Sequence, residues 1–173
     1  MRRVSVAGIS GSGKSTVGRA LAQRLGAPYV ELDALVHGPG WIEATDDELR
    51  ERIDQAIDGA DAWVVDGNYR RKIGDHVLRR ADTLVWLDLP LRVCLARIAR
   101  RTSSRIRRRE ELWNGNRETI RNALFTRDSL FAWAVRSHFA NRTKIPQYLA
   151  ANPHLDVVHL RTPRHVDTWL SSL

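Results

Sequence analysis

The stretch GISGSGKS, from Gly8 to Ser15, matches the pattern G-x-x-x-x-G-K-[S/T] without a mismatch. It follows an apolar run typical of a buried strand, RRVSVAG at 2–8, and it precedes a segment with helical periodicity at 15–25. This context matters because the backbone N–H groups at the start of a helix must point at the bound phosphates. The stretch therefore predicts a P-loop that binds a nucleoside triphosphate.

The chemistry of a P-loop assigns a role to most of these residues. Glycines let the backbone curl, so we expect the N–H groups from about Gly11 to Thr16 to surround the β-phosphate. We expect Lys14 to bridge the β- and γ-phosphates of ATP, and the Ser15 hydroxyl to bind Mg²⁺. The predicted nucleotide-binding residues are Gly8, Gly11, Ser12, Gly13, Lys14, Ser15 and Thr16.

Four further apolar runs are interpreted as strands, and amphipathic stretches separate them. The runs are PYVEL at 28–32, AWVVD at 62–66, TLVWLD at 83–88 and LDVVHL at 155–160. Helices are expected at 46–58, 70–80, 90–101 and 164–172, with more over 110–150 and a break near 126–128. Alternating strands and helices predict a parallel sheet covered on both faces, which is a three-layer α/β sandwich.

Composition agrees with one globular domain over residues 1–173, since 43% of residues are hydrophobic and 28% are charged. The sequence has no apolar run near the 18 or so residues that span a membrane. Its single cysteine, Cys94, cannot form an internal disulfide, which favours a reducing compartment. We therefore expect a cytoplasmic protein without a membrane partner.

Basic charge is concentrated in the second half of the chain. Residues 1–90 carry 12 basic and 14 acidic side chains, whereas residues 91–173 carry 16 basic and 6 acidic ones. Seven arginines stand within the thirteen residues RIARRTSSRIRRR at 97–109. Such crowding predicts a polyanionic partner, which is either a nucleic acid or the phosphates of a nucleotide.

Further segments carry a family resemblance. DGNYRR at 66–71 closes the third expected strand, and LDLPLRVCLARIARR at 87–101 leads into the arginine run. Together with the P-loop they resemble the nucleoside-monophosphate-kinase-like P-loop kinases, the adenylate kinase superfamily. LDALVHGPGW at 32–41 and ELWNGNRETIRNALFTRDS at 111–129 resemble a narrower group within it, the bacterial adenylate-kinase-like proteins labelled DNA topology modulation proteins.

The resemblance implies a P-loop NTPase fold with five parallel strands in the order 2-3-1-4-5. It implies a core at about 1–96 and 150–173, and a short arginine-rich lid with a helical region at about 97–149. It also implies ATP as the phosphoryl donor and Mg²⁺ as the metal ion.

Two acids stand where expected strands end, at the edge of the sheet where such folds bind ligands. The implied strand order places Asp66 beside the P-loop, so we expect Asp66 to act in catalysis, where it would orient either the Mg²⁺ shell or a substrate hydroxyl. Asp88 is the rival acid. We interpret Asp88 instead as the cap of the helix that begins near Pro90.

The phosphoryl acceptor is expected beside the end of the second strand. Asp33 is the candidate base for an acceptor hydroxyl, with a helix cap as the alternative. Arg70 corresponds to the arginine that holds the acceptor's anion, with a solvated arginine as the alternative. Trp41 either stacks on an acceptor base or, as we favour, covers the core. The predicted acceptor-binding residues are Asp33, Trp41, Gly67, Asn68, Arg70, Arg117 and Arg121.

The arginine run fits a role in phosphoryl transfer. Arg97 and Arg101 share a helix face at a spacing of four, and guanidinium groups match the charge that develops on a γ-phosphate. We expect both to act in catalysis when a lid closes. Arg107–Arg109 are interpreted as a solvated basic rim.

These features predict an ATP- and Mg²⁺-dependent phosphotransferase that acts on a small acceptor. Asn68 and Tyr69 stand where adenylate kinases carry an aromatic residue and a proline, so a nucleotide, a nucleoside, a sugar and another small anion all stay open as acceptors. The alternatives are a nucleic-acid-associated regulator that binds ATP, which the basic half would serve, and a weak ATPase without an acceptor.

Overall fold

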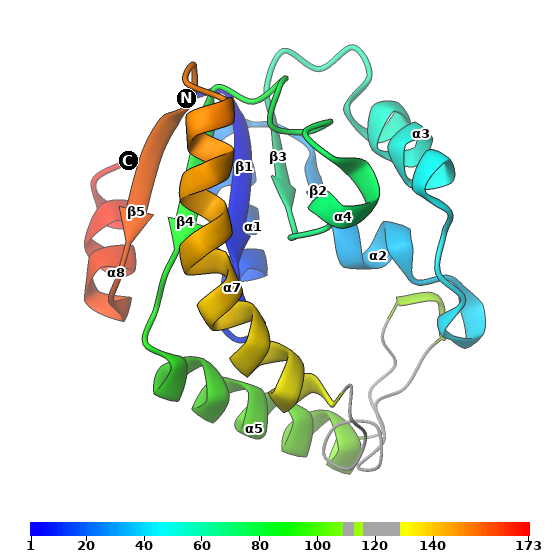
Figure 1. Cartoon of the computed structure of the whole chain (residues 1–173), viewed down its shortest axis with the longest axis vertical. Helices are drawn as coiled ribbons and strands as arrows, with labels where there is room; N and C mark the ends of the chain where they lie inside the picture. The colour runs from blue at the N-terminus through cyan, green and yellow to red at the C-terminus, as the bar shows by residue number, and fades with distance from the viewer. Residues whose placement is uncertain (109–112, 116–128) are drawn as a thin grey trace.

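The computed structural model describes residues 1–108, 113–115 and 129–173. Within them, five strands form one parallel sheet in the order β2-β3-β1-β4-β5 (Figure 1). The strands are β1 (Arg3–Gly8), β2 (Tyr29–Glu31), β3 (Trp63–Asp66), β4 (Thr83–Leu87) and β5 (Asp156–Leu160). The predicted sheet and its strand order are therefore confirmed.

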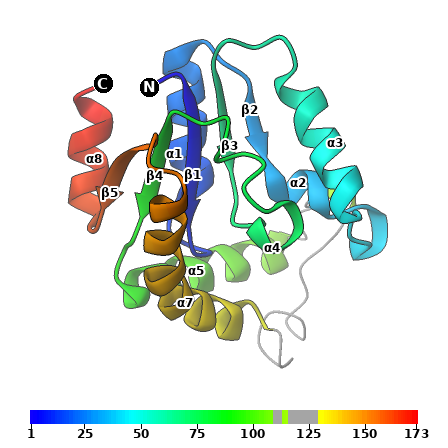
Figure 2. The ribbon, with the colours of Figure 1, turned by 45° about the horizontal axis from the view of Figure 1, so that its top comes forward.

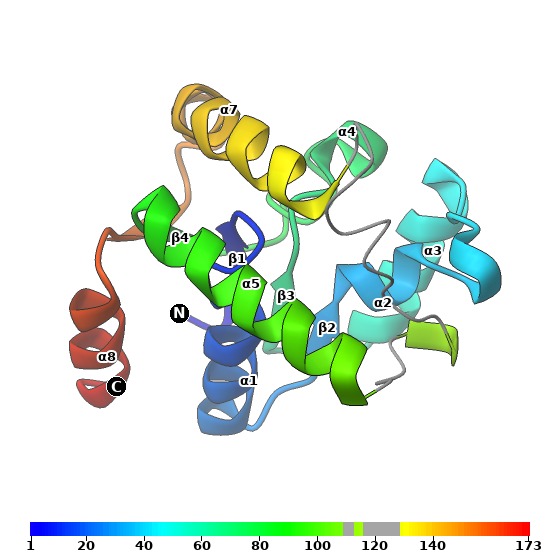
Figure 3. The same ribbon diagram turned by 90° about the horizontal axis from the view of Figure 1, so that it is seen from below.

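Helices cover both faces of the sheet, which confirms the three-layer sandwich (Figures 2 and 3). One face packs against α1 (Lys14–Leu25) and α8 (Pro163–Ser171). The other face packs against α3 (Asp46–Ile57), α4 (Arg70–Ile73) and α7 (Leu130–Ala151).

Neighbouring residues of the central strands belong to different cores. Val64 of β3 packs towards α1 and α8, whereas Val65 packs towards α3. This alternation follows from the strand geometry, in which successive side chains point to opposite faces. Because both faces are covered, the central strands are mostly apolar rather than alternating, as parallel strands usually are, with Ser5, Asp66 and Thr83 as their buried polar residues.

Helix α5 (Leu91–Arg108) crosses below the carboxyl ends of the strands, where the P-loop lies (Figure 3). At Gly11, where φ is +76°, a Cβ atom would lie 2.4 Å from the Cys94 carbonyl oxygen and 2.9 Å from Cγ1 of Ile98. No side chain fits there, so α5 rests directly on the backbone of the loop.

Two expected helices differ from the structure. The helix predicted over 70–80 is wrong beyond Ile73, because Gly74 adopts φ 58° and ψ −134° and ends the helix. Val77 and Leu78 are buried from turns, and they supplied the apolar periodicity. The helix expected at 90–101 continues to Arg108.

Two short helices within 32–41 were not predicted, whereas a third short helix falls inside the region 110–150, where helices were expected. Within 32–41 lie α2 (Leu32–Val36) and the 3-10 helix η1 (Pro39–Trp41), and a second 3-10 helix, η2, spans Trp113–Gly115. The break predicted near 126–128 lies outside the described residues. Among the helices that the structure describes, none is both long and apolar enough to cross a membrane.

Candidate active site

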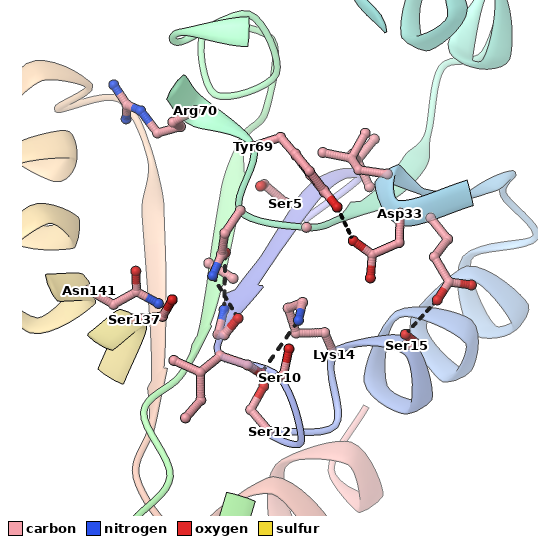
Figure 4. Close-up of a pocket in the computed structure, with 18 of the residues that line it drawn as sticks. Ser5, Ser10, Ser12, Lys14, Ser15, Asp33, Tyr69, Arg70, Ser137 and Asn141 are labelled. Carbon is pink, nitrogen blue, oxygen red and sulfur yellow. Dashed lines mark hydrogen bonds between the residues drawn. The ribbon is translucent and has the colours of Figure 1, made fainter. Parts of the chain in front are cut away.

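A cavity of about 1580 Å³ opens at the carboxyl edge of the sheet, between the P-loop, α2, the loop after β3, and α7 (Figure 4). All seven predicted nucleotide-binding residues line it. So do most of the other predicted site residues, namely Asp33, Trp41, Gly67, Asn68, Arg70, Arg97 and Arg101. Asp66 is not among the lining residues, and Arg117 and Arg121 lie outside the described residues.

The P-loop has the geometry of an anion site. Helix α1 begins at Lys14, directly after Gly13, whose φ of 97° is in the left-handed region. The Ser12 N–H donates to the Ile9 carbonyl at 3.1 Å, which closes the loop. The Lys14 ammonium lies 3.5 Å from the same carbonyl oxygen. A lysine and a helix N-terminus thus meet in one cavity, where both attract phosphate.

Glu31 is the acid at the P-loop hydroxyl, and the sequence reasoning missed it. Its Oε1 accepts a hydrogen bond from the Ser15 hydroxyl at 3.0 Å, and its Oε2 pairs with Arg19 at 2.9 Å. The available signal was its position at the end of β2, where a carboxylate emerges at the ligand edge.

Asp66 occupies a different environment from the one expected. It is 1% exposed, and its Oδ2 accepts a hydrogen bond from the Tyr29 hydroxyl at 2.7 Å. Burial raises the pKa of the Asp66 carboxyl, while the nearby Lys14 ammonium opposes the rise. Its sheet partners are Val6 and Glu31, and unlike Glu31 it does not line the cavity.

The donor atoms at Ser15 suit Mg²⁺. A hydroxyl and a carboxylate are hard oxygen ligands, and Mg²⁺ is commonly held by one or two such groups together with substrate phosphates. Within the described residues there is no cluster of three or more His, Cys, Asp or Glu side chains that would form an all-protein metal site. The residues therefore fit a magnesium ion that is shared with the nucleotide.

Asp33 lies in the first turn of α2 and faces the cavity. Its Oδ1 accepts a hydrogen bond from the Tyr69 hydroxyl at 2.6 Å, and the His37 Nε2 lies 3.2 Å from that hydroxyl. The N-cap residue of α2 is Glu31. The alternative interpretation of Asp33 as a helix cap is therefore wrong.

Gly67 and Asn68 pack the loop after β3 against α2 and against the start of the P-loop. The Asn68 side chain accepts from the Gly8 N–H at 3.3 Å and donates to the Gly8 carbonyl at 2.7 Å. At Gly67, with φ at +135°, a Cβ atom would lie 2.8 Å from Cβ of Leu32. The contact of Gly67 and Asn68 with the acceptor stays a prediction. In the structure, Asn68 holds the start of the P-loop and Gly67 allows close packing against Leu32.

Arg70 and Trp41 border the acceptor side of the cavity. The Arg70 guanidinium lies 3.4 Å from the centroid of the Tyr148 ring and pairs with Asp75, so it is not a solvated arginine. Trp41 is 37% exposed and makes an edge contact with His37, with centroids 5.4 Å apart. The favoured interpretation, in which Trp41 covers the core, is wrong.

Arg97 reaches the P-loop from α5, because its Nη1 donates to the Ser12 carbonyl at 3.1 Å. Arg101 and Arg105, on the following turns, also line the cavity. Arg97 is exposed, but its contact with the Ser12 carbonyl is already formed in this structure and needs no movement of a lid. Arg107 and Arg108 are exposed, and Arg109 lies outside the described residues.

Asp88 ties α7 to the edge of the sheet. Its two carboxylate oxygens bond to Nε of Arg142 at 2.9 Å and to Nε2 of His159 at 3.3 Å. The His159 ring stacks on Trp86, with centroids 4.0 Å apart. These are the described partners of the Asp88 carboxylate, so it acts as a structural tie and not as the expected helix cap.

We expect Asp88→Asn to lower the free energy of unfolding by about 1–3 kcal/mol, because a hydrogen-bonded charge is lost from a side chain that is 11% exposed. Urea unfolding measures this loss. The exposed Asp61 offers a matched control, since Asp61→Asn should change stability by less than about 0.5 kcal/mol. Equal stability of the two variants would contradict the structural role of Asp88.

Comparison with known proteins finds a matching family model and several similar kinases. Residues 4–121 match the family model described as an AAA domain. A shikimate kinase from Nitratidesulfovibrio vulgaris is 37% identical, over 57% of this chain and 63% of that protein. The chain therefore spans less than two thirds of that relative's length.

Two solved structures share the fold. One is a gluconokinase from Sinorhizobium meliloti 1021, with a TM-score of 0.52, 22% identity, and coverage of 99% of this chain and 92% of that chain. The other is a shikimate kinase from Acinetobacter baumannii in complex with shikimate, with a TM-score of 0.54, 16% identity, and coverage of 99% and 90%. These neighbours support the P-loop kinase fold. The narrower resemblance to adenylate kinases or topology modulation proteins stays a prediction.

Proposed function

The chain belongs to the AAA domain family, and from this premise we propose that it is a kinase that transfers the γ-phosphate of ATP to a hydroxyl group of a small, acidic acceptor. The observation that carries the proposal is that the P-loop lysine, Lys14, and the carboxylate of Asp33 line one cavity (Figure 4). A phosphate site and a candidate base for an alcohol are the two parts that such a transfer requires.

The residues divide the work of the reaction. The P-loop N–H groups and Lys14 bind the phosphates of ATP, and Ser15 with Glu31 would hold Mg²⁺. When bound, Mg²⁺ supplies positive charge that neutralises the β- and γ-phosphate oxygens. Asp33 accepts the proton of the acceptor hydroxyl as that oxygen forms its bond to the γ-phosphorus. The bond from the γ-phosphorus to the bridging oxygen breaks, and ADP leaves.

The walls of the acceptor side favour an anion that also carries hydroxyl groups. Ser137, Asn141 and Lys144 follow one face of α7 at spacings of four and three, and all three line the cavity. In Figure 4, Ser137 and Asn141 stand across the space from Asp33. The Asn141 Nδ2 atom is buried without a hydrogen-bond partner among the described residues, so it can donate to a ligand oxygen.

Similarity supports the same class of acceptor. One structural neighbour binds shikimate, a carboxylic acid with several hydroxyl groups, and another is named a gluconokinase. A nucleotide is the second candidate, because the exposed Trp41 at the cavity offers a ring on which a base would stack.

A screen of ADP release tests the proposal. The acceptors are shikimate, gluconate, other sugar acids, nucleosides and nucleoside monophosphates, each with Mg-ATP. We expect a hydroxylated acid to accelerate ADP release well above the rate with ATP alone. Acceleration by a nucleoside monophosphate alone would favour the second candidate, and no acceleration by any acceptor would contradict the kinase.

With the working acceptor, Asp33→Asn should lower kcat by about 10²–10⁴-fold, because the proton acceptor is lost. Affinity for Mg-ATP, measured by calorimetry, should stay unchanged. Asp46 is a matched control, since it lines the same cavity but lies at its rim and faces Lys72 at 3.8 Å. Asp46→Asn should keep kcat within a few-fold of the parent, and an Asp33→Asn variant with parental kcat would exclude Asp33 as the base.

A further inference from the structure

The loop between β3 and α4 touches both halves of the candidate site through two adjacent residues. Asn68 makes two hydrogen bonds with the backbone of Gly8, at 3.3 and 2.7 Å, where the P-loop begins. Tyr69 is next in the chain, and its hydroxyl donates to Oδ1 of Asp33 at 2.6 Å. One dipeptide therefore bonds to the phosphate-binding loop on one side and to the candidate base on the other.

Tyr69 is itself held firmly. Its ring packs against the core cluster that includes Val36 and Ile73, and it begins α4 as the N-cap residue. Burial raises the pKa of the Tyr69 hydroxyl, and the charge of Asp33 raises it further, so the hydroxyl stays protonated. Its single proton is committed to Asp33, and the hydroxyl oxygen therefore accepts from Nε2 of His37, at 3.2 Å.

These contacts restrict Asp33 in a useful way. A carboxylate has two oxygens, and the Tyr69 bond occupies Oδ1 and fixes the rotamer. The second oxygen is left for the proton of an acceptor hydroxyl. A misplacement of about 1 Å at a reacting group lowers the rate by about 10²-fold. A hydrogen bond that holds Asp33 in place can therefore have a large effect on kcat.

We propose that Asn68 and Tyr69 form a spacer that sets the distance between the γ-phosphate and the base, and that Tyr69 is a positioning residue which orients Asp33. This inference rests on the proposed kinase function. It assigns a purpose to the Asn–Tyr pair that stands where adenylate kinases carry an aromatic residue and a proline.

The test compares Tyr69→Phe with Tyr148→Phe, using the acceptor that the screen identifies. Both changes remove one hydroxyl and keep the ring. Tyr148 also lines the cavity, but its contacts with Arg70 and Asn152 are made by its ring and its backbone carbonyl. We measure kcat, the KM for the acceptor, and the number of ADP molecules formed per phosphorylated acceptor.

We expect Tyr69→Phe to lower kcat about 10–100-fold while KM changes by less than about three-fold, because the base loses its orientation and not its substrate. More than one ADP should form per product, since a misplaced acceptor hydroxyl lets water take the phosphate. Tyr148→Phe should keep the parental kcat and a ratio of one. In the Asp33→Asn background, Tyr69→Phe should cause no further loss.

Several results would overturn the role of Tyr69. They are an unchanged kcat and ratio in Tyr69→Phe, an effect on KM alone, or a loss that adds fully to that of Asp33→Asn. If Tyr69→Phe proves too unstable to assay, His37→Ala reports on the same chain of bonds, and parental values there overturn the proposal equally. A parent protein that no acceptor accelerates would overturn the proposed function, and with it this role.

Discussion

Replacement of Lys14 by alanine should abolish phosphoryl transfer and leave the fold intact. The side chain points into the cavity, and the described bond of its ammonium, to the Ile9 carbonyl at 3.5 Å, is too long to contribute much stability. With ATP bound, we expect the ammonium to face the charge that grows on the γ-phosphate during transfer. Loss of such a clamp costs about 10³-fold or more in kcat.

The measurement is acceptor-dependent ADP release, with circular dichroism and thermal unfolding as tests of the fold. Lys72→Ala is the matched control, because Lys72 also lines the cavity but pairs with Glu43 at 3.1 Å and with a backbone carbonyl at 3.0 Å. It should keep turnover within about ten-fold, since its partners are protein groups and not phosphate. Parental turnover in Lys14→Ala would contradict the kinase altogether.

Arg97→Ala should be nearly as damaging, whereas Arg107→Ala should not. Arg97 sits at the P-loop through its bond to the Ser12 carbonyl, so we expect its guanidinium to lie close to the γ-phosphate of bound ATP. Loss of such an arginine costs about 10³-fold in related transfer reactions. Arg107 is exposed, and at physiological salt its charge is screened within about 8–10 Å.

The same pair of variants tests the nucleic-acid alternative. A chain that grips DNA with its arginine run should lose affinity to a similar degree in both variants. Each lost phosphate contact would flatten the dependence of log affinity on log salt by about one unit. We expect no such pattern in DNA retention measured across a salt series. Equal losses in DNA binding with unchanged kcat would favour a regulator over a kinase.

The P-loop and the sheet could be predicted because their signals are local. GISGSGKS is contiguous, and a strand buried on both faces is apolar along its length, so β3 and β4 were recognised within one or two residues. The segment after Arg70 shows where this approach fails. Val77 and Leu78 have helical spacing with Ile73, but Gly74 turns the chain, and the buried residues reach the core from turns.

The site was only partly predictable, because several of its contacts join a side chain to a distant group. Glu31 was counted as part of a strand, and its bond to Ser15 depends on how β2 lies beside α1. Asn68 was predicted to contact the acceptor, whereas its side chain forms two hydrogen bonds with the backbone of Gly8, sixty residues away. Neither contact leaves a periodic trace in the sequence.

The close packing of α5 against the P-loop backbone restricts how this loop can be exchanged between proteins. Gly11 occupies a position that the general pattern leaves open to any residue, but here the Cys94 carbonyl fills the space of a side chain. A loop grafted from another nucleotide-binding protein would bring its own residue to that position and collide with the helix backbone. Loop and helix must therefore be transplanted, or diverge in evolution, as one unit.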